Sequence, residues 1–413
     1  MTATFQYDPA FLRSGIELSP IVMPLRPAAY SFPGLAQESF HGLPGLLADS
    51  LPDRFGNAIV DAWLASQGRA PSDFNAVERL CYTGARGMGA LEFIPARGPE
   101  PGPDAEVEVA ALVALASQVL SDRETFVASL AGSQKGDGVA DILRVGTSAG
   151  GARAKAVIAF HPGTGEVRSG QVHPGDGFEH WIIKFDGVRG NKDKELDDPR
   201  GYGTIEYAYF LMARAAGVVM SDCRMFGEGG RRHFMARRFD RLSDGDKLHV
   251  QSFGALCHFD FNAAGAHSYE QVMLAIRRLG MDMETIEQMF RRMAFNIVAR
   301  NQDDHVKNIA FLMDRSGRWT LAPAFDVTYS YAPSGAWTGR HQMSLNTKRD
   351  DFTRADFSAC GQVASLRRGR ARAILDEVIE SVGRWSTYAD AAAVAGSHAE
   401  KIARTLRLDI PAR

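Results

Sequence analysis

The chain has 413 residues, a formal net charge of −2 and 45% hydrophobic residues. This length and composition predict a globular protein of two or three domains. The balanced charge argues against a protein that coats nucleic acid through its overall charge. No apolar run approaches the roughly 20 residues that span a bilayer, and the N-terminus has no basic stretch followed by an apolar core, so we expect no signal peptide.

The cysteines are widely spaced and form no CxxC pair, at Cys81, Cys223, Cys257 and Cys360. This spacing disfavours a disulfide framework or a structural zinc site. We therefore expect a protein of the reducing cytoplasm, without a membrane partner.

Helical and extended patterns alternate in the first 245 residues. A helix is predicted over about residues 53–67, a linker rich in Pro and Gly over residues 96–107, and a second helix in VEVAALVALASQVL. Strands are predicted on both sides of a glycine-rich turn in DILRVGTSAGGARAKAVIAFHP, and again in HWIIKFDG and RRHFMARRFDR. Between the last two strands, we expect a helix that begins with a Thr204 cap and ends at a glycine.

From about residue 250 the pattern is mostly helical. Apolar residues recur at helical spacing in SYEQVMLAIRRLG and METIEQMFRRMAFNIVARN. A β-hairpin follows, with the strands IAFLMD and WTLAPAFD joined by the turn RSGR, and the remaining C-terminal sequence returns to helical spacing. The chain therefore has a β-rich part followed by an α-rich part.

A dense set of polar residues, NQDDHVKN, follows the second of these helices. Asp303 and Asn308 lie five residues apart, and the hairpin then returns the chain to Asp326. This order of groups is typical of ATP-dependent phosphoryl transfer, in which the first Asp accepts a hydroxyl proton and the Asn and the second Asp hold Mg²⁺. The alternative is a polar loop that caps a helix, and the hairpin between the carboxylates favours the functional interpretation. 

Two further residues of this loop have different expected roles. His305 is expected to orient the loop by hydrogen bonding rather than to bind a metal, because no other His is near in sequence. Asp304 is expected to be either solvated or structural.

The glycine-rich turn contains Gly146, Gly150 and Gly151. Such glycines let backbone N–H groups approach phosphates, but the spacing matches neither GxGxxG nor GxxxxGK[ST], so an ordinary hairpin turn is an equal alternative. The hydroxyls of Thr147 and Ser148 are candidates for phosphorylation.

Lys184 lies on the apolar strand of HWIIKFDG. A lysine in this setting either extends to solvent or meets a negative charge, which in an ATP site is phosphate. Glu206, on the following helix, is its candidate ion-pair partner.

Further on, backbone groups of residues 237–239 could bind adenine, with Asp240 near the ribose. The order of these elements is that of a two-lobed protein kinase.

The chain resembles the HipA family of serine/threonine kinases, the toxins of HipA–HipB toxin–antitoxin pairs. The resemblance rests on GLPGLLADSLPDRFG, SAGGARAK, WIIKFD, ARRFDR, NQDDHVKN, LAPAFDV and SLNTKRDDFTRADF, which occur in the family's order over about residues 35–370. The motif at Asp326 reads FDV, where ordinary protein kinases have DFG.

The resemblance implies a role for each matching position. Asp303 is implied as the catalytic aspartate, and Asn308 and Asp326 as the magnesium ligands. The implied ATP-binding residues are Lys184, Gly150, Gly151, Ala152, Arg237, Phe239 and Asp240. Ser148, with Thr147 as the alternative, falls where the family autophosphorylates a loop serine and thereby silences the kinase. A phosphoserine of charge near −2 would then occupy a site shaped for ATP phosphates.

The implied fold is α+β and protein-kinase-like, with a β-rich N-terminal lobe and a mostly α-helical C-terminal lobe. We expect an N-terminal subdomain over residues 1–135, the N-terminal lobe over 136–245 and the C-terminal lobe over 246–413.

The implied activity is ATP- and Mg²⁺-dependent phosphorylation of a protein target, by resemblance an aminoacyl-tRNA synthetase, which would inhibit translation, arrest growth and lead to persistence. The implied partner is a HipB-like helix-turn-helix antitoxin, with operator DNA reached only through that complex. Two alternatives stay open. The first is a catalytically weak scaffold that acts as a co-repressor, and the second is a small-molecule phosphotransferase.

A basic segment near the C-terminus, SLRRGRARAILDEV, allows two interpretations. Its arginines are either a solvated helical face or a contact with DNA phosphates, and the net charge favours the solvated face. They are Arg367, Arg368, Arg370 and Arg372.

Overall fold

The computed structural model describes residues 2–66, 68–98, 108–121, 153–171, 175–188, 201–242 and 245–412. These residues form two compact units, each built from segments that are distant in sequence. Unit 1 comprises Met1–Asp49, Thr204–Ser221 and Val250–Arg413, and unit 2 comprises Ser50–Gly203 and Asp222–His249. In this grouping residues 1–49 belong with the C-terminal part of the chain, and the three-part division expected from the sequence stays a prediction.

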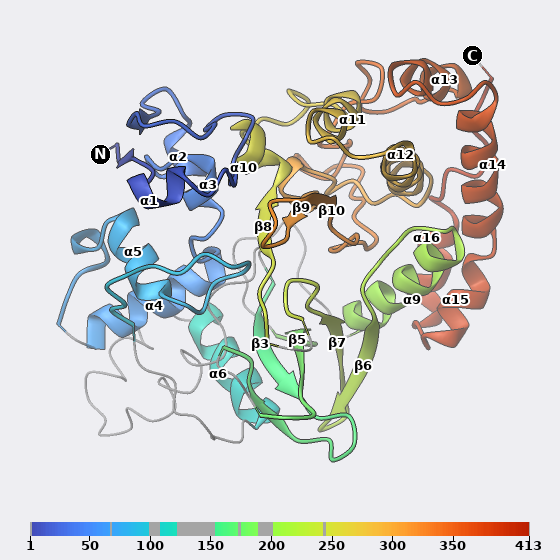
Figure 1. Cartoon of the computed structure of the whole chain (residues 1–413). Helices are drawn as coiled ribbons and strands as arrows, with labels where there is room; N and C mark the ends of the chain where they lie inside the picture. Colours follow the sequence, from blue (N-terminus) through green and yellow to red (C-terminus); the bar gives the residue numbers. More distant parts are fainter. Residues whose placement is uncertain are drawn as a thin grey trace. The chain divides into compact units, whose positions relative to one another are not determined.

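Unit 2 is built on a five-stranded antiparallel sheet with the strand order β4-β3-β5-β7-β6 (Figure 1). The strands are β3 (Lys155–Phe160), β4 (Val167–Ser169), β5 (Glu179–Lys184), β6 (Cys223–Glu228) and β7 (Arg231–Arg237). Strand β3 is buried along its whole length, which explains the apolar run AVIAF that follows Lys155. The predicted strands in HWIIKFDG and RRHFMARRFDR are confirmed as β5 and β7.

The helices of unit 2 share a hydrophobic core with this sheet. They are α4 (Arg54–Ser66), α5 (Ala76–Thr83) and α6 (Val109–Ser121), with the 3-10 turn η1 (Pro71–Asp73). Ile59 of α4 and Val113 of α6 are buried in one cluster with Ile158 and Ile183 of the sheet. The helix predicted at residues 53–67 is therefore confirmed as α4, and its apolar face packs on the sheet core.

Unit 1 is mostly helical in its C-terminal part. Its longer helices are α9 (Tyr202–Ala215), α11 (Tyr269–Arg278), α12 (Met283–Val298), α13 (Arg354–Val363), α14 (Arg370–Gly383), α15 (Trp385–Ala391) and α16 (Gly396–Ala403). Helix α12 packs against both α11 and α14 (Figure 1). Its buried positions, such as Phe290, Met293 and Ile297, follow the 3.6-residue period that predicted it.

Local signals set the helix ends. The Asp282 side chain accepts a hydrogen bond from Thr285 N at 2.9 Å and so caps α12. Helix α9 begins two residues before Thr204, so Thr204 is a buried residue of the first turn and the predicted Thr204 cap is wrong. The predicted glycine stop is present, because Gly217 follows the helix with a φ of 78°.

A three-stranded sheet with the order β10-β9-β8 precedes the C-terminal helices. The predicted hairpin is confirmed as β9 (Ala310–Met313) and β10 (Trp319–Leu321), whose register pairs Trp319 with Met313. Strand β8 (His249–Ser252) runs directly into α10 (Phe253–Cys257).

The N-terminal segment of unit 1 consists of short elements. They are β1 (Thr4–Phe5), α1 (Pro9–Leu12), β2 (Tyr30–Ser31), α2 (Gln37–Phe40) and α3 (Gly45–Ala48). Helix α3 packs against α10. No helix in the described part of the chain combines the length and apolarity that a membrane span requires.

Candidate active site

The NQDDHVKN loop begins where α12 ends, because Arg300 has a φ of 58° and turns the chain out of the helix. Asn301 forms a parallel bridge with Ser330, and Gln302 N donates to Ser330 O at 3.1 Å. The 3-10 turn η2 (Val306–Asn308) then leads into β9. The loop is therefore held between a long buried helix and the segment that follows the hairpin.

Asp303 keeps its side chain 41% exposed at the surface of this loop. Its Oδ1 accepts a hydrogen bond from the indole Nε1 of Trp337 at 2.6 Å. The imidazole Nε2 of His305 lies 3.8 Å from the same oxygen. Asp303 is thus accessible to a substrate while two neighbours fix its orientation.

Asn308 is bound to the same loop. Its Nδ2 donates to the backbone oxygen of Asp303 at 2.7 Å. Because the amide nitrogen is used in this way, the Oδ1 atom is the group that can bind a cation. The role of Asn308 as a magnesium ligand stays a prediction, in which Oδ1 would be the ligand atom.

Asp326 follows β10 in a left-handed conformation, with a φ of 52°. Such a conformation is unfavourable for a non-glycine residue and often occurs at functional sites. The neighbours of Asp326 in sequence, Phe325 and Val327, line one small cavity together with Asn308 and His305. The hairpin therefore brings the residues on both sides of Asp326 to a cavity that Asn308 and His305 also line, and the role of Asp326 as a magnesium ligand stays a prediction.

The residues present fit a magnesium ion better than a metal that needs many protein ligands. The described residues contain no group of three or more His, Cys, Asp or Glu side chains that could hold a metal. Mg²⁺ usually takes only one or two carboxylates, with phosphate and water oxygens completing its shell. One carboxylate and one amide oxygen, from Asp326 and Asn308, agree with that pattern.

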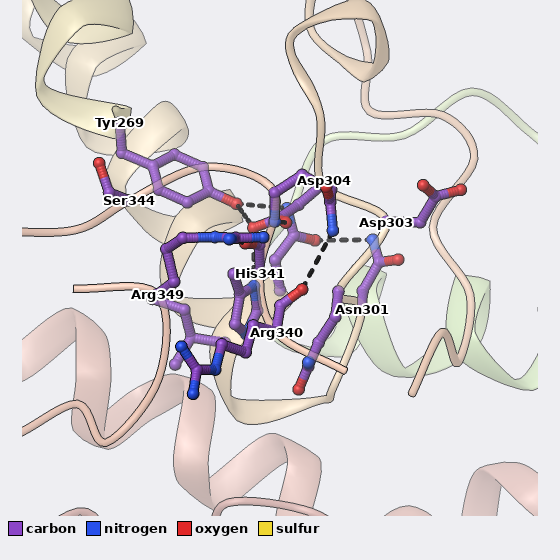
Figure 2. Close-up of polar contacts among 12 residues, drawn as sticks. Tyr269, Asn301, Asp303, Asp304, Arg340, His341, Ser344 and Arg349 are labelled. Atoms are coloured by element: carbon purple, nitrogen blue, oxygen red, sulfur yellow. Dashed lines mark hydrogen bonds and ion pairs between the residues drawn. The ribbon is translucent and has the colours of Figure 1, made fainter. Parts of the chain in front are cut away.

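Asp304 is buried and structural, which decides between the two expected roles. It is 3% exposed. Its carboxylate accepts hydrogen bonds from Tyr269 Oη at 2.6 Å, His341 Nδ1 at 2.7 Å and Gln342 N at 2.7 Å (Figure 2). Burial alone would raise the pKa of Asp304, but His341 and the other donors outweigh it and hold that pKa below its usual range. The residue next to Asp303 is thereby an ionised anchor for the loop.

The anchor extends to the C-terminal segment. His341 Nε2 lies 2.9 Å from Arg407 Nη1. An arginine can only donate, so His341 accepts at Nε2 and carries its proton on Nδ1, where it donates to Asp304. Arg407 in turn pairs with Asp350.

Lys184 of unit 2 occupies the end of β5, where it pairs in register with Lys155 of β3 and Phe234 of β7. Its Nζ lies 5.8 Å from the centre of the Phe234 ring. Lys155 is buried, and its Nζ lies 3.5 Å from Asp53 Oδ2. The sheet therefore places Lys184 and Lys155 on neighbouring strands, and Lys155 forms an ion pair with Asp53.

Arg237 and Asp240 lie at and just beyond the end of β7. The backbone N–H of Arg237 donates to Asp222 O at 2.8 Å. Asp240 is fully buried, and its carboxylate accepts from Arg238 Nη2 at 2.7 Å, Arg241 Nη1 at 2.8 Å and Gly89 N at 2.7 Å. Within unit 2 these groups thus have structural partners, and their contacts with adenine and ribose stay predictions. Phe239 is half-buried between them.

Several predicted positions lie outside the described residues: Gly146, Thr147, Ser148, Gly150, Gly151 and Ala152. The predicted partner of Lys184, Glu206, is buried on α9, and their ion pair stays a prediction.

In the basic C-terminal segment, two arginines have carboxylate partners. Arg370 Nε donates to Glu287 at 2.9 Å, and Arg372 lies 3.7 Å from Asp376. Arg367 and Arg368 are exposed. A contact of this segment with DNA stays a prediction.

Sequence reasoning missed three residues that support the loop and one ion pair within unit 2. Trp337 and His341 are separated from the loop by more than 30 residues, and Arg407 by about 100, so no local pattern joins them to it. The Asp53–Lys155 pair is likewise visible only once α4 packs on the sheet. The only sequence feature that could have indicated a role for Trp337 is its position, as a tryptophan in the segment after the hairpin.

The described residues define an α+β protein of the kinase-like class, with a mostly helical unit and a unit built on a β-sheet. Two family descriptions match the sequence: "HipA-like C-terminal domain" over residues 147–386 and "HipA N-terminal domain" over residues 1–94. The chain belongs to the HipA family.

Two known proteins illustrate the relationship. The HipA chain of a complex described as "Toxin Antitoxin System HipA, HipB and its operator DNA complex", from Shewanella oneidensis MR-1, is similar in fold, with a TM-score of 0.68 at 16% identity over 98% of this chain and 89% of that one. "Putative kinase Y4mE" of Sinorhizobium fredii is 25% identical over 198 residues, or 44% of this chain and 47% of the relative. This chain therefore matches about half the length of that curated relative.

Proposed function

We propose that this protein is an ATP- and Mg²⁺-dependent serine/threonine protein kinase, the toxin of a HipA–HipB-type pair. The observation that carries the proposal is the loop in which the Asp303 side chain is exposed, the Asn308 amide nitrogen is bound to Asp303 O, and the residues flanking Asp326 line a cavity with Asn308. A buried carboxylate, Asp304, holds this loop with three hydrogen bonds. Catalysis of phosphoryl transfer depends mainly on such positioning.

Each group has a defined task in the proposed reaction. Asp303 orients the substrate hydroxyl and accepts its proton while the hydroxyl oxygen bonds to the γ-phosphorus and the bond to ADP breaks. Asn308 and Asp326 would hold Mg²⁺, which would neutralise phosphate charge when bound. Lys184 binds phosphate. The glycine-rich segment with Gly150, Gly151 and Ala152 covers the phosphates. Arg237 and Phe239 bind the adenine, and Asp240 lies near the ribose.

We further propose that Ser148, or Thr147, is the autophosphorylated residue that silences the kinase. The protein target is proposed to be an aminoacyl-tRNA synthetase, whose phosphorylation inhibits translation. Both proposals rest on the family to which the chain belongs. The first rests also on the neighbouring hydroxyls of Thr147 and Ser148, at the start of the sequence TSAGGARAK.

The test is intact-mass and peptide mass spectrometry after incubation with Mg-ATP, with Asp303→Asn as the comparison. The Asn oxygen can still accept the Trp337 hydrogen bond, so the fold and loop should persist while proton acceptance is lost. We expect phosphate on Ser148 or Thr147 in the wild type, with a loss of about 100-fold or more in the variant. Equal phosphorylation of both proteins, in a preparation free of other kinases, would disprove the role of Asp303.

A second candidate function is a co-repressor scaffold that acts with a HipB-like antitoxin on operator DNA. The observation that favours it is the similarity in fold to the HipA chain of a HipA–HipB–operator complex. A scaffold does not require Mg-ATP, so wild-type protein with neither phosphate transfer nor thermal stabilisation by Mg-ATP would favour this function.

A further inference from the structure

A second polar cavity lies in unit 1, in the segment between Asp326 and α13. Its volume is about 180 Å³, and it is lined by Pro333, Gly335, Ala336, Gly339, Arg340 and Arg349. We refer to it as the arginine pocket. Both arginines lie beside His341 of the loop anchor (Figure 2).

The wall of the arginine pocket is a small loop closed by its own hydrogen bonds. Gly335 N donates to Ala332 O at 2.9 Å, and Gly339 N donates to Gly335 O at 3.2 Å. A Cβ atom on Gly339 would lie 2.5 Å from Gly335 O, so only glycine permits this close approach. The pocket is therefore a feature of the folded backbone and not a space between freely moving side chains.

The two arginines of the pocket have no carboxylate partner. Within the described part of the chain, no carboxylate oxygen lies within 4.0 Å of either guanidinium, and the Arg340 side chain is exposed. Arg349 uses Nε to donate to His341 O at 2.6 Å. Burial lowers the pKa of Arg349, and the positive charge of Arg340 lowers it further, while the negative charge of Asp304 opposes both effects. Two like charges at one cavity are unfavourable until an anion neutralises them.

The arginine pocket is connected to the catalytic carboxylate through its own wall. Trp337, between Ala336 and Gly339 in this loop, donates to Asp303. Gln342 donates through Nε2 to the backbone oxygens of Trp337 and Arg340, and through its backbone N to Asp304. A group bound between the arginines is thus fixed relative to the loop that performs the proposed transfer.

We infer that the arginine pocket binds a phosphate group. Two guanidiniums supply two positive charges and planar pairs of donors, which match a phosphate of charge near −2. Resting on the proposed kinase function, this phosphate belongs to the protein substrate, where it anchors the polypeptide beside the hydroxyl to be phosphorylated. The pocket then selects substrates that already carry a phosphorylated side chain.

The first test is isothermal titration of the full-length protein with inorganic phosphate at constant ionic strength. Arg340→Gln should weaken phosphate binding about tenfold or more, since a charge-assisted pair of hydrogen bonds is lost. Arg340→Lys keeps the positive charge but loses the planar pair of guanidinium donors, so its affinity for phosphate should lie between those of the wild type and Arg340→Gln. Arg368→Gln is the matched control, because Arg368 is an exposed arginine of the same unit outside the pocket; it should bind phosphate as the wild type does.

Equal phosphate affinity in wild type and Arg340→Gln would overturn the inference, as would no measurable binding by the wild type.

The source of the phosphate is tested by a second titration with a phosphoserine peptide and its unphosphorylated form. Tighter binding of the phosphopeptide than of free phosphate, lost in Arg340→Gln, supports a substrate anchor; tighter binding of free phosphate would overturn the anchor role. These titrations need no catalysis, so failure of the proposed kinase activity is observed separately.

Discussion

At the scale of single residues, the unusual group beneath the loop is Arg292 of α12. It is 7% exposed, and within the described residues its Nε has no hydrogen-bond partner. Burial lowers its pKa to about 9, so it is still charged at neutral pH. Its side chain lines a cavity of about 20 Å³ with Asn301, His305 and Asn308. A buried charge without a partner is costly, so its retention suggests a task at the loop.

We therefore predict that Arg292→Met stabilises the protein and slows phosphoryl transfer. Removing the unpartnered charge should raise the free energy of unfolding by about 1–2 kcal/mol, which corresponds to a rise of roughly 1–2 °C in Tm for a chain of this length. The loop loses a polar neighbour, so kcat should fall. Thermal denaturation and autophosphorylation rates measure the two effects.

The neighbouring arginine provides a matched control. Arg291 has partners, because it donates to Ala216 O at 2.9 Å and forms an ion pair with Glu377 at 2.5 Å. Arg291→Met should therefore lower Tm or leave it unchanged. A lower Tm in Arg292→Met than in Arg291→Met would show that Arg292 has a stabilising partner after all.

Single residues also show which features of the candidate site can be predicted from the sequence. The spacing of Asp303, Asn308 and Asp326 is local, and the hairpin between Asn308 and Asp326 follows from its alternating pattern, so the sequence is sufficient to predict that the three residues lie together. The support for this group is not local. Asp304 was left between a solvated and a structural role because its partners Tyr269 and His341 are selected by packing over long sequence separations.

At the scale of elements, the N-terminal segment is attached to unit 1 through α3 and α10. Gly45 begins α3, and a Cβ atom at this position would lie 2.3 Å from the backbone oxygen of Ala255. Gly45 N also donates to His258 Nε2 at 3.0 Å. Just after α3, Asp49 accepts hydrogen bonds from Ser252 N at 2.6 Å and Ser252 Oγ at 2.9 Å. The two short helices are thus in backbone contact, which the sequence motif GLPGLLADS did not by itself predict.

We predict that Gly45→Ala separates α3 from α10 and destabilises the N-terminal segment. Overpacking of this kind costs about 1–3 kcal/mol, because backbone, not a mobile side chain, meets the new methyl group. Limited proteolysis should then cut residues 2–44 faster than in the wild type. Gly34→Ala is the control, because a Cβ at Gly34 meets nothing within 4 Å. Equal digestion of Gly45→Ala and Gly34→Ala would contradict the predicted contact.

At the scale of the whole molecule, each compact unit is assembled from segments that are distant in sequence. The sequence predicted most of the helices and strands, because periodicity is a local property. It did not predict that residues 1–49 join the C-terminal unit, because that depends on contacts such as those of Gly45 and Asp49. Unit 2 has a comparable long-range connection, in which Asp240 joins the end of β7 to Gly89.

The Asp240 cluster predicts how stability depends on pH in acid. Burial alone would raise the pKa of Asp240, but the positive charges of Arg238 and Arg241 and the Gly89 N–H outweigh it and hold the pKa at about 2. The unfolded carboxyl has a pKa near 3.8, so the folded state binds fewer protons between these values. The carboxylate therefore stabilises the fold fully above about pH 4, and about 2 kcal/mol of that stability is lost as the pH falls to about 2.

Asp240→Asn tests this prediction, since it leaves the buried Arg238 without its charged partner. At pH 7 the variant should be less stable than the wild type by about 3 kcal/mol or more. The difference should narrow between pH 4 and pH 2, because only the wild type loses stability there by protonation of Asp240. Urea denaturation at a series of pH values measures the difference, with Asp61→Asn, at a half-exposed ion pair of α4, as the control. A difference between wild type and Asp240→Asn that stays constant down to pH 2 would mean that Asp240 is protonated in the folded protein at neutral pH or is not coupled to its arginines.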